Sequence, residues 1–312
     1  MALRTSKIRK AEFHSSGKEK AVMEYFEAKT VDEASRFLRE HPEARVLAGG
    51  ASLVVLLKNG LIRPSHLVNL KTIPGLNAIE QAEGCLRIGA LNRHGDILSS
   101  PAIRKICPLL PEAASKIASP PIRNMGTIGG NLCHADPAAD FPPSLIALGA
   151  KAKLVSDEGE RTVPVEKLFV GYYETVLSPT EILAEISIPS LNRRSSGSYV
   201  TLDQVTNGVS IVGVAAVVGL ADDGSCAFAG IGLGGVAPTP LKVERAKEIL
   251  VGRKIRDADI ECAAEEARTI CNPTGNSFAS AEYRREMVRV LTKRALRDAL
   301  KRIGEGRTFS GE

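Results

Sequence analysis

The segment from Ile122 to Asp140, IRNMGTIGGNLCHADPAAD, constrains this chain more than any other. Three of its glycines surround a Thr127-Ile128 step, and glycine lets the backbone approach another group closely or adopt a positive φ. Successive main-chain N–H groups can then form one concavity, which holds a phosphate without a basic side chain. The alternative is a turn that only changes the direction of the chain. This segment alone leaves both interpretations open.

A second glycine segment, Ala48–Leu53 (AGGASL), favours phosphate binding. The residues from Val46 to Ala48 are typical of a short buried strand, and an apolar segment follows the turn from Leu53 to Leu57. Two such segments could hold the two phosphates of a dinucleotide from both sides. Neither fits GxGxxG after a strand or GxxxxGK[ST], which disfavours the Rossmann and P-loop folds.

Both glycine segments closely resemble the flavin-binding signatures of one family, the FAD-binding medium subunits of molybdenum hydroxylases. Aerobic-type carbon monoxide dehydrogenase and the xanthine dehydrogenase group belong to it. The resemblance runs from Tyr25 to Leu300, and three further stretches carry it: Phe169–Pro189, Gly234–Leu250 and Ala281–Leu296. It implies an α+β protein that carries FAD.

The resemblance also implies the residues that bind FAD. They lie in the two glycine segments and at two later positions: Ala48, Gly49, Gly50, Ala51, Ser52, Leu53, Thr127, Ile128, Gly129, Gly130, Asn131, Asp140 and Leu183. Asp140 could accept hydrogen bonds from cofactor hydroxyls or cap the helix that follows it. Leu183 could lie beside the flavin or be an ordinary core residue. We expect Gly129→Val or Gly50→Val to remove the flavin and leave the protein folded.

One departure from the family concerns the flavin edge. Many relatives carry a lysine two residues after the aromatic residue that opens the strand beyond the linker. Here Tyr199 is followed by Val200 and Thr201, so Thr201 replaces the lysine. The aspartate of the relatives' pattern is also missing, and the run Asn207–Ser210 stands in its place. Without the fixed positive charge an anionic reduced flavin is disfavoured, so we expect altered redox tuning.

Composition excludes several classes of protein. A chain of 312 residues can form two domains, and its 44% hydrophobic and 25% charged residues are ordinary globular values. It has no tryptophan and only 4% aromatic residues, which argues against nucleic-acid binding. The N-terminus lacks the apolar core of a signal peptide, and the longest apolar run, Ile211–Leu220, is too short to span a bilayer. We therefore expect a cytoplasmic protein with no transmembrane segment.

The cysteines indicate neither disulfides nor a metal centre. None of the six forms a CxxC pair, so we expect reduced, mostly buried thiols and no iron–sulfur cluster in this chain. His134 follows Cys133, but no second ligand stands at metal-binding spacing. No Ser-His-Asp or paired-carboxylate pattern is evident, so we assign no catalytic residue and no metal ligand.

The order of the predicted elements indicates three parts. Residues 1–20 form a mobile basic arm, and residues 21–194 form a two-lobed FAD-binding domain, by resemblance of the vanillyl-alcohol-oxidase-like (PCMH) type. Residues 197–304 form a smaller domain, after a linker at Asn192–Gly197. We expect one helix at Ala102–Ile117 and, in the smaller domain, a three-stranded antiparallel sheet followed by helices. The ranges are Tyr199–Val205, Val209–Leu220 and Cys226–Leu233 for the strands, and Pro240–Val251, Asp257–Ile270 and Ser280–Ile303 for the helices.

By resemblance, the chain is the electron-transfer subunit of a molybdenum hydroxylase. A small iron–sulfur subunit would deliver single electrons, and a large molybdopterin subunit would hydroxylate the substrate, in a heterotrimer or a dimer of heterotrimers. The flavin would pass electrons to NAD, a quinone or oxygen. One alternative is a self-sufficient FAD-dependent NAD(P)H reductase of the same broad fold. Another is a scaffold that has lost FAD, which the intact glycines oppose.

Overall fold

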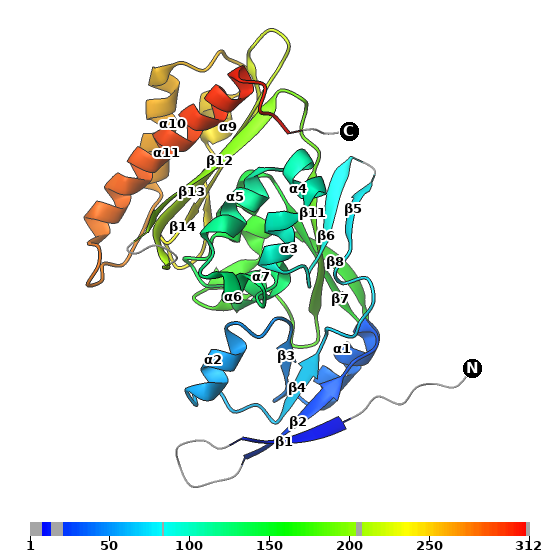
Figure 1. The fold of residues 1–312 in the computed structure, drawn as a ribbon. Coiled ribbons are helices and arrows are strands. Elements are labelled where there is room, and N and C mark those ends of the chain that lie inside the picture. Colours follow the sequence, from blue (N-terminus) through cyan, green and yellow to red (C-terminus); the bar gives the residue numbers. More distant parts are fainter. Residues whose placement is uncertain (1–7, 14–20, 83, 204–207, 310–312) are drawn as a thin grey trace.

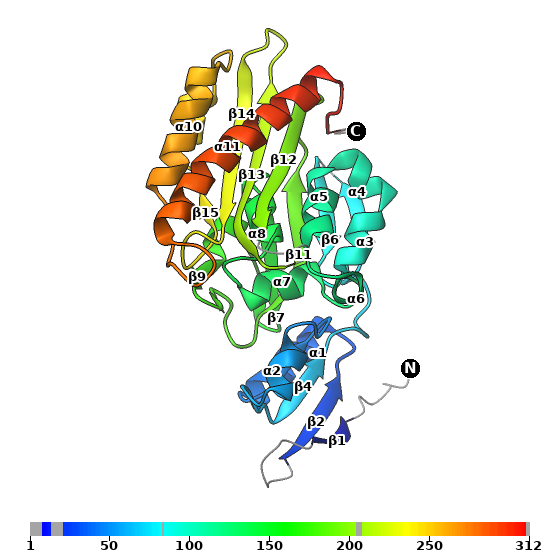
Figure 2. The same ribbon diagram turned by 60° about the vertical axis from the view of Figure 1, so that its left-hand side comes forward.

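A computed structural model describes residues 8–13, 21–82, 84–203 and 208–309. The chain forms three parts in sequence order, from the blue lobe through the cyan and green middle to the yellow and red C-terminal part (Figures 1 and 2). None of the helices in the described ranges has the length and apolar character that a membrane span requires.

The first lobe is a four-stranded sheet with two helices. Its strands, in the order β1-β2-β4-β3, are β1 (Ile8–Phe13), β2 (Ala21–Glu27), β4 (His66–Asn69) and β3 (Arg45–Leu47), with α1 (Val31–Glu40) and α2 (Leu53–Lys58). The predicted mobile arm is wrong for residues 8–13, because these pair with β2 as an antiparallel strand. Residues 1–7 and 14–20 lie outside the described residues. Thr30 caps α1 by accepting a hydrogen bond from the Glu33 N–H.

The second lobe is built on a five-stranded antiparallel sheet. The strand order is β5-β6-β11-β7-β8, with β5 (Ile79–Ala82), β6 (Cys85–Gly89), β11 (Ile182–Pro189), β7 (Lys151–Ser156) and β8 (Gly159–Pro164). A short pair, β9 (Phe169–Gly171) and β10 (Glu174–Thr175), adds a hairpin after the 3₁₀ turn Val165–Lys167. The helices are α3 (His94–Ser99), α4 (Pro101–Ile106), α5 (Leu109–Lys116), α6 (Pro120–Arg123), α7 (Ile128–His134) and α8 (Phe141–Ala147).

The single helix predicted over Ala102–Ile117 is wrong. The structure has α4 and α5 in its place, separated by Cys107 and Pro108. Pro108 has no N–H to donate and its ring obstructs a continuing helix, so the chain stops and restarts there. The apolar positions of the prediction nevertheless lie in the core: Ile103, Leu109, Leu110 and Ala113 are fully buried.

The C-terminal part is a four-stranded antiparallel sheet covered by helices. Its order is β12-β13-β14-β15, with β12 (Ser195–Asp203), β13 (Ser210–Leu220), β14 (Cys226–Gly234) and β15 (Leu241–Lys242). The prediction of a three-stranded sheet is therefore wrong, because the sheet has a fourth strand. Its fourth strand, β15, begins the range predicted as the helix Pro240–Val251, of which only α9 (Ala246–Leu250) is helical. The predicted linker is also too long, because Ser195 to Gly197 belong to β12 and are buried.

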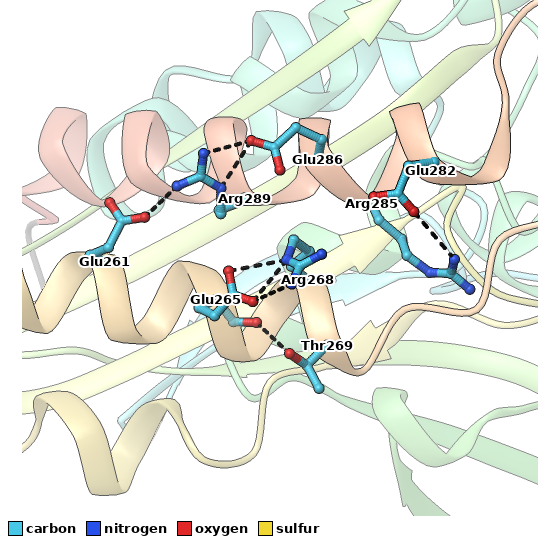
Figure 3. A network of polar contacts seen from close by, with 8 residues as sticks. All are labelled: Glu261, Glu265, Arg268, Thr269, Glu282, Arg285, Glu286 and Arg289. Atoms are coloured by element: carbon cyan, nitrogen blue, oxygen red, sulfur yellow. Dashed lines mark hydrogen bonds and ion pairs between the residues drawn. The ribbon is translucent and has the colours of Figure 1, made fainter.

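Two long helices pack on the outer face of this sheet (Figure 2). They are α10 (Asp257–Thr269) and α11 (Ala281–Gly304), as the sequence predicts to within one residue at each end. One ion pair in Figure 3 joins the two helices: Arg289 of α11 contacts Glu261 of α10. Arg289 also contacts Glu286 within α11, and Arg268 contacts Glu265 within α10. Ion pairs near the surface add little to stability.

Helix α8 packs against the opposite face of the sheet. Strand β13 alternates between the two cores, with Val214, Ala216 and Val218 under α10 and α11 and with Ala215 and Val217 toward α8. Strand β14 presents glycines to α8: a Cβ at Gly230 would lie 2.0 Å from the Ala147 oxygen, and one at Gly232 would lie 2.1 Å from the Pro143 oxygen. Glycine thus lets the main chain of α8 lie directly on the strand.

Candidate functional site

The two glycine segments, far apart in sequence, lie against each other. The first joins β3 to α2 in the lower lobe, and the second leads into α7 in the middle lobe (Figure 1). A Cβ at Gly49 would lie only 2.0 Å from the main-chain oxygen of Met125, and one at Gly130 would lie 3.9 Å from the Ala48 Cβ. The lobes therefore meet at the segments that the sequence singles out.

The first segment presents a run of unpaired main-chain donors. In the described part of the chain, the N–H groups from Gly49 to Leu53 donate no hydrogen bond, although these residues are at most half exposed. Gly50 has φ 88°, which turns the chain between β3 and α2. Main-chain N–H groups that are neither paired nor fully solvated favour an anionic ligand.

The second segment differs from its prediction, because its donors are satisfied internally. Thr127 caps α7, and the helix starts at once. The N–H groups of Ile128, Gly129 and Gly130 donate to the Asn92 oxygen at 2.9 Å, the Ala90 oxygen at 2.9 Å and the Thr127 Oγ1 at 3.1 Å, respectively. The predicted concavity of N–H groups is therefore wrong for these three residues. The side-chain Oδ1 of Asn131 is buried without a partner in the described part of the chain.

Gly129 serves packing. A Cβ there would lie 2.5 Å from the Ala90 Cβ and 2.8 Å from the Ala90 oxygen. Gly129→Val would push α7 away from the end of β6, so the expectation that this variant stays folded is not supported by the contacts. At Gly50 a side chain would meet only the ends of Leu47 and Val54, but φ 88° strains any residue other than glycine.

Asp140 is buried and connects the second segment to the C-terminal sheet. Its Oδ1 accepts a hydrogen bond from the Tyr199 hydroxyl at 2.8 Å and lies 3.1 Å from the Ser210 hydroxyl oxygen. Burial raises the pKa of Asp140 to about 6, against the hydrogen bond from Tyr199. Asp140 precedes α8 but makes no side-chain cap, so the capping alternative is wrong. No local pattern indicates Tyr199 and Ser210 as partners, since they follow 59 and 70 residues later.

The resemblance places Thr201 at the position of the relatives' lysine. Thr201 is connected to Asp140 through Asp203 and Ser210. Its hydroxyl donates to Asp203 Oδ2 at 3.1 Å, and Ser210 lies 2.8 Å from Asp203 Oδ1. Of the run Asn207–Ser210, Asn207 lies outside the described residues.

The remaining predicted residues have mixed environments. Leu183 is buried in the core of the second lobe, at a bulge of β11. Tyr172 and Tyr173 are more than half exposed, so neither packs in a core. Of the six free cysteines, Cys107, Cys226 and Cys271 are buried, whereas Cys133 and Cys262 are exposed.

Sequence reasoning missed His94. It is buried, stands 2.5 Å from where a Gly126 Cβ would be, and its Nδ1 has no partner in the described part of the chain. Burial, and then the positive charge of Arg123, lowers the pKa of His94 to about 4, so the ring is neutral. A neutral ring against Gly126 explains why this position tolerates no side chain.

Two packed lobes with facing glycine segments, followed by a sheet covered by helices, define a nucleotide-cofactor protein of two domains. The family model "FAD binding domain in molybdopterin dehydrogenase" matches residues 20–191, and "CO dehydrogenase flavoprotein C-terminal domain" matches residues 198–299. The chain therefore belongs to the family of FAD-binding subunits of molybdopterin dehydrogenases, and it is an oxidoreductase subunit whose cofactor is FAD.

Individual relatives agree with the family models. The chain is 36% identical to the 6-hydroxypseudooxynicotine dehydrogenase complex subunit alpha of Paenarthrobacter nicotinovorans, over 89% of this chain and 95% of the relative. It superposes on a carbon monoxide dehydrogenase chain from Hydrogenophaga pseudoflava with TM-score 0.87 and 36% identity, over 90% and 98% of the two chains. For quinoline 2-oxidoreductase from Pseudomonas putida 86 the TM-score is 0.82 at 31% identity, over 89% and 96%.

Proposed function

We propose that this chain holds FAD between its two glycine segments and passes electrons from partner iron–sulfur clusters to an external acceptor. The observation that carries the site is the run of unpaired N–H groups from Gly49 to Leu53, which suits a pyrophosphate. The segment Thr127–Asn131 closes the other side, and Asp140 and Leu183 contribute from the second lobe. Bound there, FAD supplies two-electron redox chemistry, while the protein holds and orients it.

We also propose the domain boundaries expected from the sequence. Residues 21–194 form the FAD-binding domain, with two lobes of the vanillyl-alcohol-oxidase-like type, and residues 197–304 form the C-terminal domain. The break between the two matched ranges, after residue 191 and before residue 198, supports this division.

The substrate-oxidising centre belongs to other subunits. Relatives are named as medium chains or as subunits of complexes, and one solved structure that the chain resembles is titled a Cu,Mo-CO dehydrogenase. We therefore assign the chain to a heterotrimer with a small iron–sulfur subunit and a large molybdopterin subunit.

A charge placed in the first segment tests the cofactor site. Ala51→Glu brings a carboxylate next to the unpaired N–H groups, and its repulsion of a pyrophosphate should weaken FAD binding at least about tenfold. Val55→Glu is the matched control, since Val55 is 52% exposed on α2. Affinity is measured by calorimetry and flavin content by absorbance. Equal affinity in both variants would contradict the assignment.

Co-expression tests the subunit assignment. We expect the chain to co-purify with iron–sulfur and molybdopterin subunits that are expressed together with it. Substrate-dependent dye reduction should require all three. Turnover of an organic substrate by this chain alone would instead favour the self-sufficient reductase.

A further inference from the structure

Four oxygen–oxygen contacts form a network around Ser210, and two of them link Asp140 to the C-terminal sheet. Tyr199 and Ser210 contact Asp140 Oδ1 at 2.8 and 3.1 Å. Ser210 also contacts Asp203 Oδ1 at 2.8 Å, and Thr201 contacts Asp203 Oδ2 at 3.1 Å. The Ser210 hydroxyl therefore lies between two carboxyl groups. All four distances fall within or close to the range of O–H···O hydrogen bonds.

Counting hydrogens shows that the hydroxyl groups alone cannot make these four bonds. Tyr199, Ser210 and Thr201 each have one hydroxyl hydrogen, and ionised carboxylates only accept. Three hydrogens cannot fill four contacts. If both carboxyls were ionised, Ser210 could donate to one of them and would face the other with lone pairs, between two like charges. A fourth hydrogen, on a carboxyl group, completes the set.

Among the described residues, the charged side chains around this network do not neutralise the two carboxyl groups in place of the fourth hydrogen. Among the described residues, neither Asp140 nor Asp203 forms an ion pair; Lys116, at the end of α5, acts on Asp140 only through space. Arg284 of α11 lies nearby, but its guanidinium donates to the main-chain oxygens of Ile211 and Gly235. At the position where relatives carry a lysine, this chain has Thr201. The negative charge is thus left without a contacting cation.

We propose that Asp140 and Asp203 share one proton through the Ser210 hydroxyl, and that this proton balances charge beside the second glycine segment where the family uses a fixed cation. Asp140 donates to Ser210 and Ser210 donates to Asp203. Tyr199 still donates to Asp140 and Thr201 to Asp203, so every contact has its hydrogen. Asp140 Oδ2 has no partner among the described residues.

The consequence is a junction that responds to pH. Burial, with a smaller contribution from the charge of Asp203, raises the pKa of Asp140 to about 6. Loss of the proton leaves two carboxylates on one hydroxyl and weakens the link between the start of α8 and the strands β12 and β13. The shared proton itself does not depend on the proposed FAD function, but any effect of a bound flavin on it does.

Infrared titration of the full-length chain tests the shared proton. A protonated carboxyl has a C=O stretch that a carboxylate lacks. We expect such a band to titrate near pH 6, as the Asp140 value indicates, and to vanish in Asp140→Asn. Asp259→Asn is the control, because Asp259 is also buried but its pKa is lowered by the hydrogen bond from the Arg256 N–H. Its variant should keep the band.

Ser210→Ala decides between the two hydrogen-bond directions. If Asp140 donates to Ser210, removing the hydroxyl lowers the proton affinity of Asp140 about tenfold, or one pH unit. If an ionised Asp140 accepts from Ser210, the same change raises the proton affinity. Ser210→Thr keeps the hydroxyl and should restore the original midpoint; Ser210→Gly replaces the alanine variant if that does not fold. An upward shift, an unchanged midpoint, or no band lost in Asp140→Asn would overturn the proposal.

Discussion

Gly232→Ala should separate α8 from the C-terminal sheet. The added Cβ would lie 2.1 Å from the Pro143 oxygen, whereas ordinary contact begins at 3.4 Å, so the two main chains must move apart by 1.3 Å (3.4 minus 2.1). A gap of about 0.5–1 Å already removes a quarter to a half of each dispersion contact. Overpacking a core costs about 1–3 kcal/mol, and a main-chain obstacle that cannot rotate away favours the upper end, about 3 kcal/mol.

Thermal unfolding measures this effect. A loss of about 3 kcal/mol lowers the Tm by roughly 6–12 °C at about 2–4 °C per kcal/mol. Gly304→Ala is the matched control, because the end of α11 leaves open space for a Cβ. It should leave the Tm unchanged or slightly higher, since alanine favours a helix over glycine. Equal Tm values for Gly232→Ala and Gly304→Ala would show that α8 does not rest on β14 as described.

Three further predictions concern charge. The pKa of Asp140 is about 6 in the folded protein, whereas its ordinary value is 3.8. Between these two pH values the folded state therefore binds more protons than the unfolded state. The free energy of unfolding should therefore fall by about 3 kcal/mol as pH rises through this window, and denaturant titrations of Asp140→Asn should lack that slope. Glu112→Gln breaks the half-buried pair with Arg302 that ties α11 to α5, which should cost about 1–3 kcal/mol in urea unfolding; no loss would contradict its role. Thr201→Lys should raise the midpoint potential of the bound flavin in a spectroelectrochemical titration, because positive charge favours the anionic reduced form. An unchanged potential with an ordered lysine would refute the reasoning.

Local patterns predicted the elements whose neighbours are close in sequence. The β-rich runs 66–70 and 85–90 predict strands, and the structure has them at His66–Asn69 and Cys85–Gly89. The apolar run 141–148 predicts a helix, which the structure has at Phe141–Ala147. The turn signal Asp223-Gly224 marks the β13–β14 hairpin, where Gly224 has φ 82°. The fourth strand could not be seen in this way, because β15 has two residues and pairs only when β14 is in place.

Contacts between domains join residues far apart in the sequence, so no local sequence pattern predicts them. Glycines are typical of a weak strand, so their role in β14 cannot be predicted from the sequence. In the structure they allow close approach by α8, which precedes them by some 90 residues. The partners of Asp140 are a tyrosine and a serine in different strands, which looked like ordinary sheet residues. The site prediction therefore identified Asp140 by resemblance and missed the hydroxyl groups that fix its environment.

The two glycine segments have similar sequences, but their main-chain N–H groups have different surroundings and therefore different roles. Both read as turns with exposed N–H groups. In the second segment, the Arg93–Thr127 bridge places the main-chain oxygens of Asn92 and Ala90 where they accept from the N–H groups of Ile128 and Gly129. The Thr127 hydroxyl accepts from the N–H group of Gly130. The first segment leaves β3 for α2 without such neighbours, so its donors stay unpaired. We therefore propose that an anion at the junction binds mainly to the first segment, while the second forms the opposite wall and continues to Asp140.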